Sequence, residues 1–185
     1  IEAMGPDYIS DRHQRNASIF TEERYQQTAF GSYEQNINPE YLEINFGNEC
    51  NFKCGYCHPK YSTRYYKEIE DFGPVTSVKN HRCDIDWMRL YQREEENPYV
   101  DAFWEWWPEL RKSLNIMRVT GGEPTLHKST WSLLDKIDID PMPWLELNIN
   151  SNLGTKTILI ERLANKVRKL QDENKIRSFK IGRAH

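Results

Sequence analysis

The stretch YLEINFGNECNFKCGYC, residues 41–57, joins an alternating segment to a close-set group of cysteines. In residues 41–47, large apolar side chains alternate with polar residues or glycine, which indicates a β-strand with one packed face. Cys50, Cys54 and Cys57 follow this segment in a C-x3-C-x2-C spacing. Because ligands of parallel α/β folds lie beyond the carboxyl ends of strands, the three thiols stand where a metal centre is expected.

The number of cysteines in this group restricts the kind of metal centre. A structural zinc site has four protein ligands, and iron–sulfur clusters of the 4Fe–4S type are usually held by four cysteines. The residues alone leave three interpretations open: an iron–sulfur cluster with one iron not bound by cysteine, a zinc site, or three buried cysteines without metal. In the zinc interpretation, the fourth ligand is His58, His81 or Cys83.

Strand-like and helix-like segments alternate along the rest of the chain. Period-two alternation predicts further strands at residues 116–120, 144–150 and 178–181. Apolar residues at three- and four-residue steps predict helices at residues 99–114, from Ser129 or Thr130 to 137, and 156–171. Shorter helices are predicted at residues 21–28 and 83–93, and residues 58–80 are expected to form a short helix or an extended loop. This order is typical of an α/β fold with a parallel sheet.

The predicted strands share one division of side chains, with an aliphatic face and a polar face. We expect the aliphatic face to pack against helices and the polar face to line an interior. A packed barrel interior holds branched apolar residues, and unpaired polar groups buried there are costly. The pattern therefore predicts an open, hydrated interior, with Arg118 paired to Glu43 or Glu146. The polar residues are Glu43, Asn45, Arg118, Thr120, Glu146, Asn148, Asn150 and Lys180.

Two short turns follow the second and third predicted strands. GGEP at residues 121–124 follows the strand at 116–120, and its glycines allow a backbone to approach a ligand closely. SNLG at residues 151–154 follows the strand at 144–150. Both turns stand at carboxyl ends, as the cysteine group does.

CNFKCGYC together with GGEP resembles the radical SAM superfamily, whose motif is C-x3-C-aromatic-x-C. Tyr56 occupies the aromatic position, and the resemblance covers about residues 40–181. It implies a partial (βα)6 TIM-like barrel, truncated here to about four βα units. It also implies a 4Fe–4S cluster held by Cys50, Cys54 and Cys57, with S-adenosylmethionine chelating the iron that no cysteine binds.

The resemblance also implies roles for residues outside the cysteine group. SNLG is similar to the family's Thr-Asn-Gly turn, with Leu153 in place of the glycine. The backbone of GGEP is expected to bind the amino group of S-adenosylmethionine, with the charge of Glu123 nearby. The expected cofactor contacts are Tyr56, Gly121, Gly122, Glu123, Pro124, Ser151 and Asn152.

The activity implied by the resemblance is radical chemistry. The reduced cluster cleaves S-adenosylmethionine to a 5′-deoxyadenosyl radical, which abstracts hydrogen from a substrate. The layout looks most like peptide- or protein-modifying members with SPASM or twitch extensions. A nucleotide- or cofactor-modifying enzyme is one alternative, and a non-catalytic iron–sulfur or zinc-binding module is another. An electron donor such as flavodoxin or ferredoxin is the expected partner.

Length and composition narrow the class of protein. The chain has 185 residues, which suits one domain. Its net charge of -3 gives no indication of an extended nucleic-acid-binding surface. The sequence contains no apolar run of about 18 residues, so no membrane span is predicted. Its first residues do not show a signal-peptide pattern. A cysteine triplet plus Cys83 is not a disulfide framework, so the reducing cytoplasm is the expected compartment. We expect a polar lead-in at residues 1–38, a catalytic core at 39–181 that is incomplete at its C-terminus, and a non-native tail at 182–185.

Overall fold

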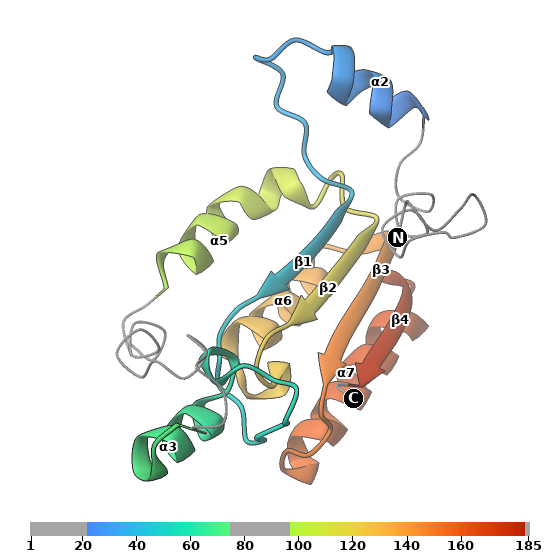
Figure 1. Cartoon of the computed structure of the whole chain (residues 1–185). Coiled ribbons are helices and arrows are strands. Elements are labelled where there is room, and N and C mark those ends of the chain that lie inside the picture. Colours follow the sequence, from blue (N-terminus) through green and yellow to red (C-terminus); the bar gives the residue numbers. More distant parts are fainter. Residues whose placement is uncertain (1–21, 75–96, 184–185) are drawn as a thin grey trace, which may run out of the picture.

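The computed structural model describes residues 22–74 and 97–183. Its centre is a four-stranded parallel sheet with strand order β1-β2-β3-β4 (Figure 1). The sequence prediction of an α/β fold with a parallel sheet is therefore confirmed. The strands are β1 (Tyr41–Asn45), β2 (Ile116–Thr120), β3 (Met142–Ser151) and β4 (Ile176–Arg183).

Three long helices connect and cover the strands. Helix α5 (Pro98–Leu110) precedes β2, α6 (Lys128–Ile139) joins β2 to β3, and α7 (Thr157–Asp172) joins β3 to β4. Their apolar sides form one core with the aliphatic face of the sheet, including Trp107, Leu134 and Leu163. Shorter elements are α2 (Glu22–Phe30), α3 (Thr63–Phe72) and the 3-10 turns η2 (Pro59–Tyr61) and η4 (Pro124–Leu126).

The strand register gives the sheet two different faces. Leu42, Met117 and Leu147 are in register across β1, β2 and β3, and Met117 and Leu147 are fully buried. Burying one such side chain contributes about 1.5–3 kcal/mol. This row and the next row on the same face therefore stabilise the packing of the sheet against the helices. The residues that follow these along each strand form a row on the opposite face of the sheet, made of Glu43, Arg118, Asn148 and Lys180.

Charged residues on the polar face pair with one another, as the sequence predicted for Arg118. Its guanidinium lies 3.8 Å from the Glu43 carboxylate. Glu146 accepts hydrogen bonds from Lys180 at 2.8 Å and from Asn148 at 3.2 Å. These hydrogen bonds, led by that from Lys180 and only partly opposed by burial, hold the pKa of Glu146 below its ordinary value.

The helix ends differ from the sequence predictions for reasons visible in the backbone. Helix α6 begins one residue before Ser129, because the His127 side chain caps it by accepting from the Ser129 N–H at 3.3 Å. Helix α5 ends at Leu110 and does not reach residue 114, and the chain goes on in a tight turn in which the Ser113 N–H and hydroxyl donate to the Leu110 carbonyl at 3.1 and 3.0 Å.

Other sequence predictions have mixed outcomes. Helix α3 occupies part of residues 58–80, with Ser62 accepting from the Tyr65 N–H at 3.1 Å. The helix expected at residues 83–93 lies outside the described residues, and so does Thr21, the expected first residue of α2. Strand β4 includes residues 182 and 183, which pair with Asn150 and Ser151.

In the described part of the chain, no helix is both long enough and apolar enough to cross a membrane.

Candidate metal centre

Three loops meet at the carboxyl edge of the sheet. The cysteine loop follows β1, the GGEP loop follows β2, and the loop at residues 152–155 follows β3. Because the strands are parallel, all three loops leave the same edge. The structure therefore brings the sequence-predicted turns next to the cysteine group.

The GGEP loop is hydrogen bonded to the backbone that leads into the cysteines. The Gly122 N–H donates to the Gly47 carbonyl at 3.2 Å, and the Glu123 N–H donates to the Glu49 carbonyl at 2.7 Å. Since these two N–H groups are already paired, the backbone of Gly122 and Glu123 can offer a ligand only carbonyl oxygens. Carbonyl oxygens accept hydrogen bonds, which suits an ammonium group.

The two glycines are required by this contact between loops. A Cβ atom on Gly122 would lie far inside contact distance of the Glu49 carbonyl oxygen. Gly121 has a φ of +109°, and a Cβ atom there would collide with the Asn45 side chain. The sequence predicted close approach to a ligand, whereas the structure shows close approach to the cysteine loop itself.

The Glu123 carboxylate is buried and joins two loops. Its side chain is 1% exposed. Its Oε1 accepts from the Thr125 N–H at 3.1 Å, the Thr125 hydroxyl at 2.7 Å and the Ser151 hydroxyl at 2.8 Å. Its Oε2 accepts from the Asn152 N–H at 2.7 Å. Each oxygen is thus committed to protein donors, and the side chain ties the end of β2 to the end of β3.

The third loop packs on the cysteine loop through amide side chains. The Asn51 amide donates to the Gly154 carbonyl at 2.9 Å, and the Asn152 amide donates to Asn51 Oδ1 at 3.1 Å. A Cβ atom on Gly154 would collide with the Phe52 ring. Leu153, at the position of the family's glycine, has a φ of +53°, a conformation that costs a branched side chain more than glycine.

Cys50 is held by groups from outside its own loop. Its N–H donates to the Thr63 hydroxyl at 3.2 Å, and that hydroxyl donates to the Cys50 carbonyl at 3.1 Å. Its Sγ accepts from the Phe52 N–H at 3.5 Å and from the Asn152 amide at 3.8 Å. Cys50 is therefore held through both its backbone and its sulfur atom.

Cys54 and Cys57 belong to a tight turn. The Cys57 N–H donates to the Cys54 carbonyl at 2.9 Å. Burial raises the pKa of the Cys57 thiol, and the charges of Cys50 and Cys54 add to the rise, while a hydrogen bond with the His58 backbone opposes it. Tyr56 is 63% exposed, and its hydrogen bond with Cys54 is the main cause that raises the pKa of its phenol. The three thiols are thus electrostatic neighbours.

The donor chemistry of the three cysteines fits a soft metal. Thiolates select zinc and iron–sulfur clusters, and all three cysteines are free rather than disulfide-bonded. Within residues 22–74 and 97–183, no three His, Cys, Asp or Glu side chains are grouped closely enough to hold a metal ion.

The candidates for a fourth zinc ligand are only partly described. His58 Nδ1 accepts from the Lys60 N–H at 3.1 Å and caps η2. His81 and Cys83 lie outside the described residues. The zinc interpretation thus stays a prediction, as does the iron–sulfur interpretation.

Several residues of the site were missed by the sequence analysis. Thr63 has no motif that marks it, since it reaches Cys50 from the start of α3. Thr125 directly follows GGEP, and its hydroxyl also lies 3.1 Å from that of Thr155. His127 lies beside Gly47, and burial, with a smaller effect of the Lys128 charge, lowers the pKa of its imidazole. For Thr125 and His127, the only signal in the sequence was a polar residue close to a glycine-containing turn.

Comparison with known proteins finds no matching protein-family model, curated protein or solved structure.

Proposed function

We propose that residues 39–181 are the core of a radical SAM enzyme. The observation that supports this most is the backbone pairing of two motifs that are far apart in sequence. The GGEP loop donates two hydrogen bonds to residues 47 and 49, directly before Cys50. This pairing puts the two motifs that carry the resemblance side by side at the carboxyl edge of the sheet, as a single shared site requires.

In this proposal Cys50, Cys54 and Cys57 hold a 4Fe–4S cluster, and S-adenosylmethionine binds beside it. When bound together, these groups supply one-electron reductive cleavage and a 5′-deoxyadenosyl radical that takes hydrogen from the substrate. The chain's own part is to hold the loops and to exclude water. Carbonyl oxygens of Gly121 and Gly122 would hold the ammonium group of S-adenosylmethionine, while Glu123 keeps the loops joined.

The polar face of the sheet is the proposed substrate surface. Arg118 Nε is buried and, in the described part of the chain, has no hydrogen-bond partner. A buried donor without a partner is costly, and a carboxylate or phosphate of a substrate would satisfy it. We favour a peptide or protein substrate, with a nucleotide or cofactor as the alternative.

The wider setting follows from the same proposal. The four strands and their helices would form part of a (βα)6 TIM-like barrel whose polar face lines the interior. Free thiols and a low-potential cluster suit the reducing cytoplasm, with a flavodoxin or ferredoxin as electron donor.

Anaerobic reconstitution with iron and sulfide tests the proposal. We expect the parent protein to turn brown, to contain a 4Fe–4S cluster by electron paramagnetic resonance, and to cleave S-adenosylmethionine after reduction. Cys54→Ala should abolish both cluster assembly and cleavage, because two thiolates cannot replace three. Cys83→Ala is the matched control, since it removes the one cysteine outside the triplet.

Three outcomes would contradict the proposal. One is a Cys54→Ala protein that still makes 5′-deoxyadenosine. Another is a colourless protein that binds zinc and loses it in Cys83→Ala, which would indicate a four-ligand zinc module. A third is a parent protein that assembles a cluster but leaves S-adenosylmethionine intact under reduction, which would indicate a non-catalytic iron–sulfur module.

A further inference from the structure

Arg118 on β2 is weakly paired for a partly buried arginine. Its contact with Glu43 Oε2 is 3.8 Å long, and the same oxygen accepts from the Tyr41 hydroxyl at 3.1 Å. The Nε of Arg118 is buried, and in the described part of the chain it has no hydrogen-bond partner. Because a guanidinium has five N–H donors and no acceptor, this arrangement leaves donor capacity unused.

A second arginine of the same fold is paired much more closely. Arg111 also has a buried Nε without a partner among the described residues. Its terminal nitrogens, however, contact oxygens of Asp140 and Pro141 at 2.8, 3.0 and 3.1 Å. The loose contact of Arg118 is therefore a property of its own position and not of every arginine in this fold.

The position of Arg118 suits a ligand that approaches the polar face of the sheet. Glu43 on β1 and Asn148 on β3 are in register with it, and helices α6 and α7 lie behind the sheet in Figure 1, on the aliphatic side. The Arg118 side chain is 29% exposed and that of Glu43 is 45% exposed, so the guanidinium is recessed beside a more open carboxylate. A strand rises about 3.3 Å per residue, which puts Arg118 about 10 Å from Gly121 of the GGEP loop.

The charges around Arg118 favour one kind of anion. Two carboxylates belong to the same face: Glu43, at 3.8 Å, and Glu146, which accepts from Asn148 at 3.2 Å. They would repel a phosphate dianion about twice as strongly as a carboxylate. A carboxylate also accepts two parallel N–H bonds from one guanidinium. Because the guanidinium is recessed, the carboxylate has to stand on a flexible stem, as it does in an aspartate or glutamate side chain.

We propose that Arg118 is a specificity-determining residue that binds an acidic side chain of a peptide substrate, and that Glu43 gives up its contact with Arg118 to that side chain. The bound carboxylate accepts from Nε–H and from one terminal N–H, which satisfies the buried donor. The inference rests on the proposed function only in taking the polar face as the substrate surface. It adds the chemical class of the substrate, a peptide with an aspartate or glutamate.

A matched pair of small ligands tests this site without iron or S-adenosylmethionine. N-acetylglutamate amide carries the side-chain carboxylate, and N-acetylglutamine amide is its neutral isostere. Each is titrated into the isotope-labelled full chain at constant ionic strength, and the Nε–H resonance of Arg118 is followed by nuclear magnetic resonance. We expect the glutamate ligand to shift this resonance to saturation. It should bind at least about tenfold more tightly than the glutamine ligand, the factor that one hydrogen bond to a charged group provides.

Three variants test the residues around the site, with backbone amide resonances of β1 and β2 as the readout. Arg118→Gln should weaken binding of the glutamate ligand at least about tenfold. Glu43→Gln should tighten it about threefold, because a competing carboxylate is removed. Arg177→Gln is the matched control, since it removes the same charge from β4, where Arg177 lies 3.9 Å from Glu146. It should change the affinity by less than about twofold.

Several outcomes would overturn the inference. One is equal binding of the two ligands to the parent protein, and another is an unchanged affinity in an Arg118→Gln protein that is folded by circular dichroism. A Glu43→Gln protein that binds the glutamate ligand no more tightly than the parent would also contradict it. Tighter binding of inorganic phosphate than of the glutamate ligand would indicate a phosphorylated substrate instead.

These outcomes are independent of those that decide the proposed function. Carboxylate-selective binding that requires Arg118 supports the inference even if no cluster assembles on reconstitution, a result that would overturn the proposed function alone. Cleavage of S-adenosylmethionine by a protein that does not distinguish the two ligands would support the proposed function and overturn the inference.

Discussion

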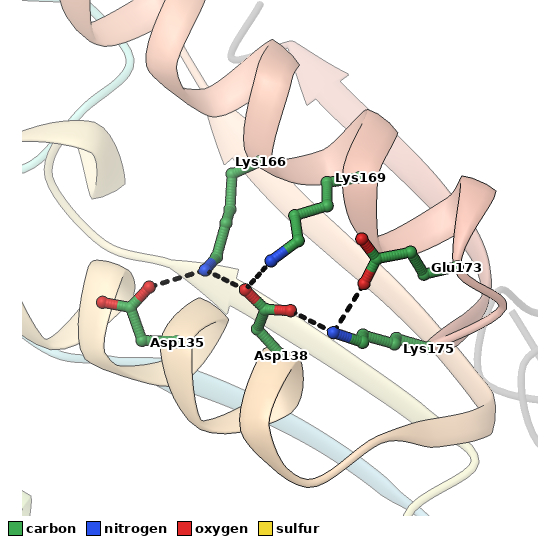
Figure 2. A network of polar contacts seen from close by, with 6 residues as sticks. All are labelled: Asp135, Asp138, Lys166, Lys169, Glu173 and Lys175. Atoms are coloured by element: carbon green, nitrogen blue, oxygen red, sulfur yellow. Dashed lines mark hydrogen bonds and ion pairs between the residues drawn. The ribbon is translucent and has the colours of Figure 1, made fainter.

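The two ends of the sheet gather polar side chains in opposite ways. At the amino end, Asp138 of α6 accepts from Lys166 at 2.8 Å and Lys169 at 2.8 Å and also pairs with Lys175 (Figure 2). Asp135 lies 2.7 Å from Lys166, and Glu173 lies 2.6 Å from Lys175. Three lysines thus balance three carboxylates within one group.

The carboxyl end of the sheet also contains hydrogen-bonded polar side chains, but three cysteine thiols lie beside them. Glu123 satisfies four donors there, and the amides of Asn51 and Asn152 pair with each other. The Cys57 N–H donates to the Cys54 carbonyl at 2.9 Å, and the Cys57 thiol donates to the His58 carbonyl at 3.6 Å. The amino end is thus a closed group of ion pairs, whereas the carboxyl end presents three cysteines at the edge where parallel α/β proteins bind their ligands.

The largest effect is expected at the carboxyl end from Glu123→Ala. Removing the carboxylate leaves the donors of Thr125, Ser151 and Asn152 buried without an acceptor, so we expect a loss of about 4 kcal/mol in the free energy of unfolding. Glu123→Gln keeps one acceptor oxygen and should lose about half as much. Urea denaturation measures both. A loss below about 1 kcal/mol in Glu123→Ala would mean that the loops are not joined through this side chain.

Substitution of glycines distinguishes packed from open parts of the same edge. Gly122→Ala places a methyl group against the Glu49 backbone, and we expect it to lower the free energy of unfolding by about 2 kcal/mol. Gly55→Ala is the matched control, because its Cβ position is open and its φ is not in the left-handed region. It should change stability by less than about 0.5 kcal/mol. Equal effects of the two substitutions in urea denaturation would contradict the described loop contact.

The smallest effect is expected at the amino end from Asp138→Asn. Hydrogen bonds from Lys166, Lys169 and Lys175 hold the pKa of Asp138 well below its ordinary value, so the folded state favours the carboxylate. We expect Asp138→Asn to cost about 1 kcal/mol at neutral pH, and less in high salt. Asp135→Asn, which removes a contact to Lys166 alone, should cost less than Asp138→Asn.

The pH dependence of this difference has a defined sign. A carboxyl group with a lowered folded pKa stabilises fully above its unfolded pKa, near 3.8, and loses that stabilisation as the pH falls toward the folded value. The stability gap between the parent and Asp138→Asn should therefore be constant above about pH 5 and shrink below about pH 4. A gap that widens in acid would exclude this origin.

Much of the fold was predictable because its signals are local. Leu42, Met117 and Leu147 alternate with polar neighbours, and that pattern follows directly from a sheet with one packed face. Helix ends were less predictable, since they depend on single hydrogen bonds. His127 caps α6 although Ser129 and Thr130 are of the commoner capping types, and α5 ends before residue 114 in a turn in which Ser113 bonds the Leu110 carbonyl.

The meeting of the candidate loops at one edge of the sheet was predictable, but their contacts were not. The cysteine spacing and the GGEP turn marked the loops, and parallel strands placed them at one edge. The partners of Glu123 and Cys50 could not be deduced, because they lie 28 and 102 positions away and no local pattern links them. Thr63 was invisible for the same reason.

The buried carboxylate of Glu123 has a consequence for how this chain can evolve. The Ser151 hydroxyl is 2.8 Å from Glu123 Oε1, and both residues are buried. An apolar residue at either position would therefore leave the polar group at the other position buried without this hydrogen bond. Descendants of a common ancestor should therefore change positions 123 and 151 in concert. Positions 43 and 118, whose ion pair is solvent-accessible and 3.8 Å long, should drift more independently.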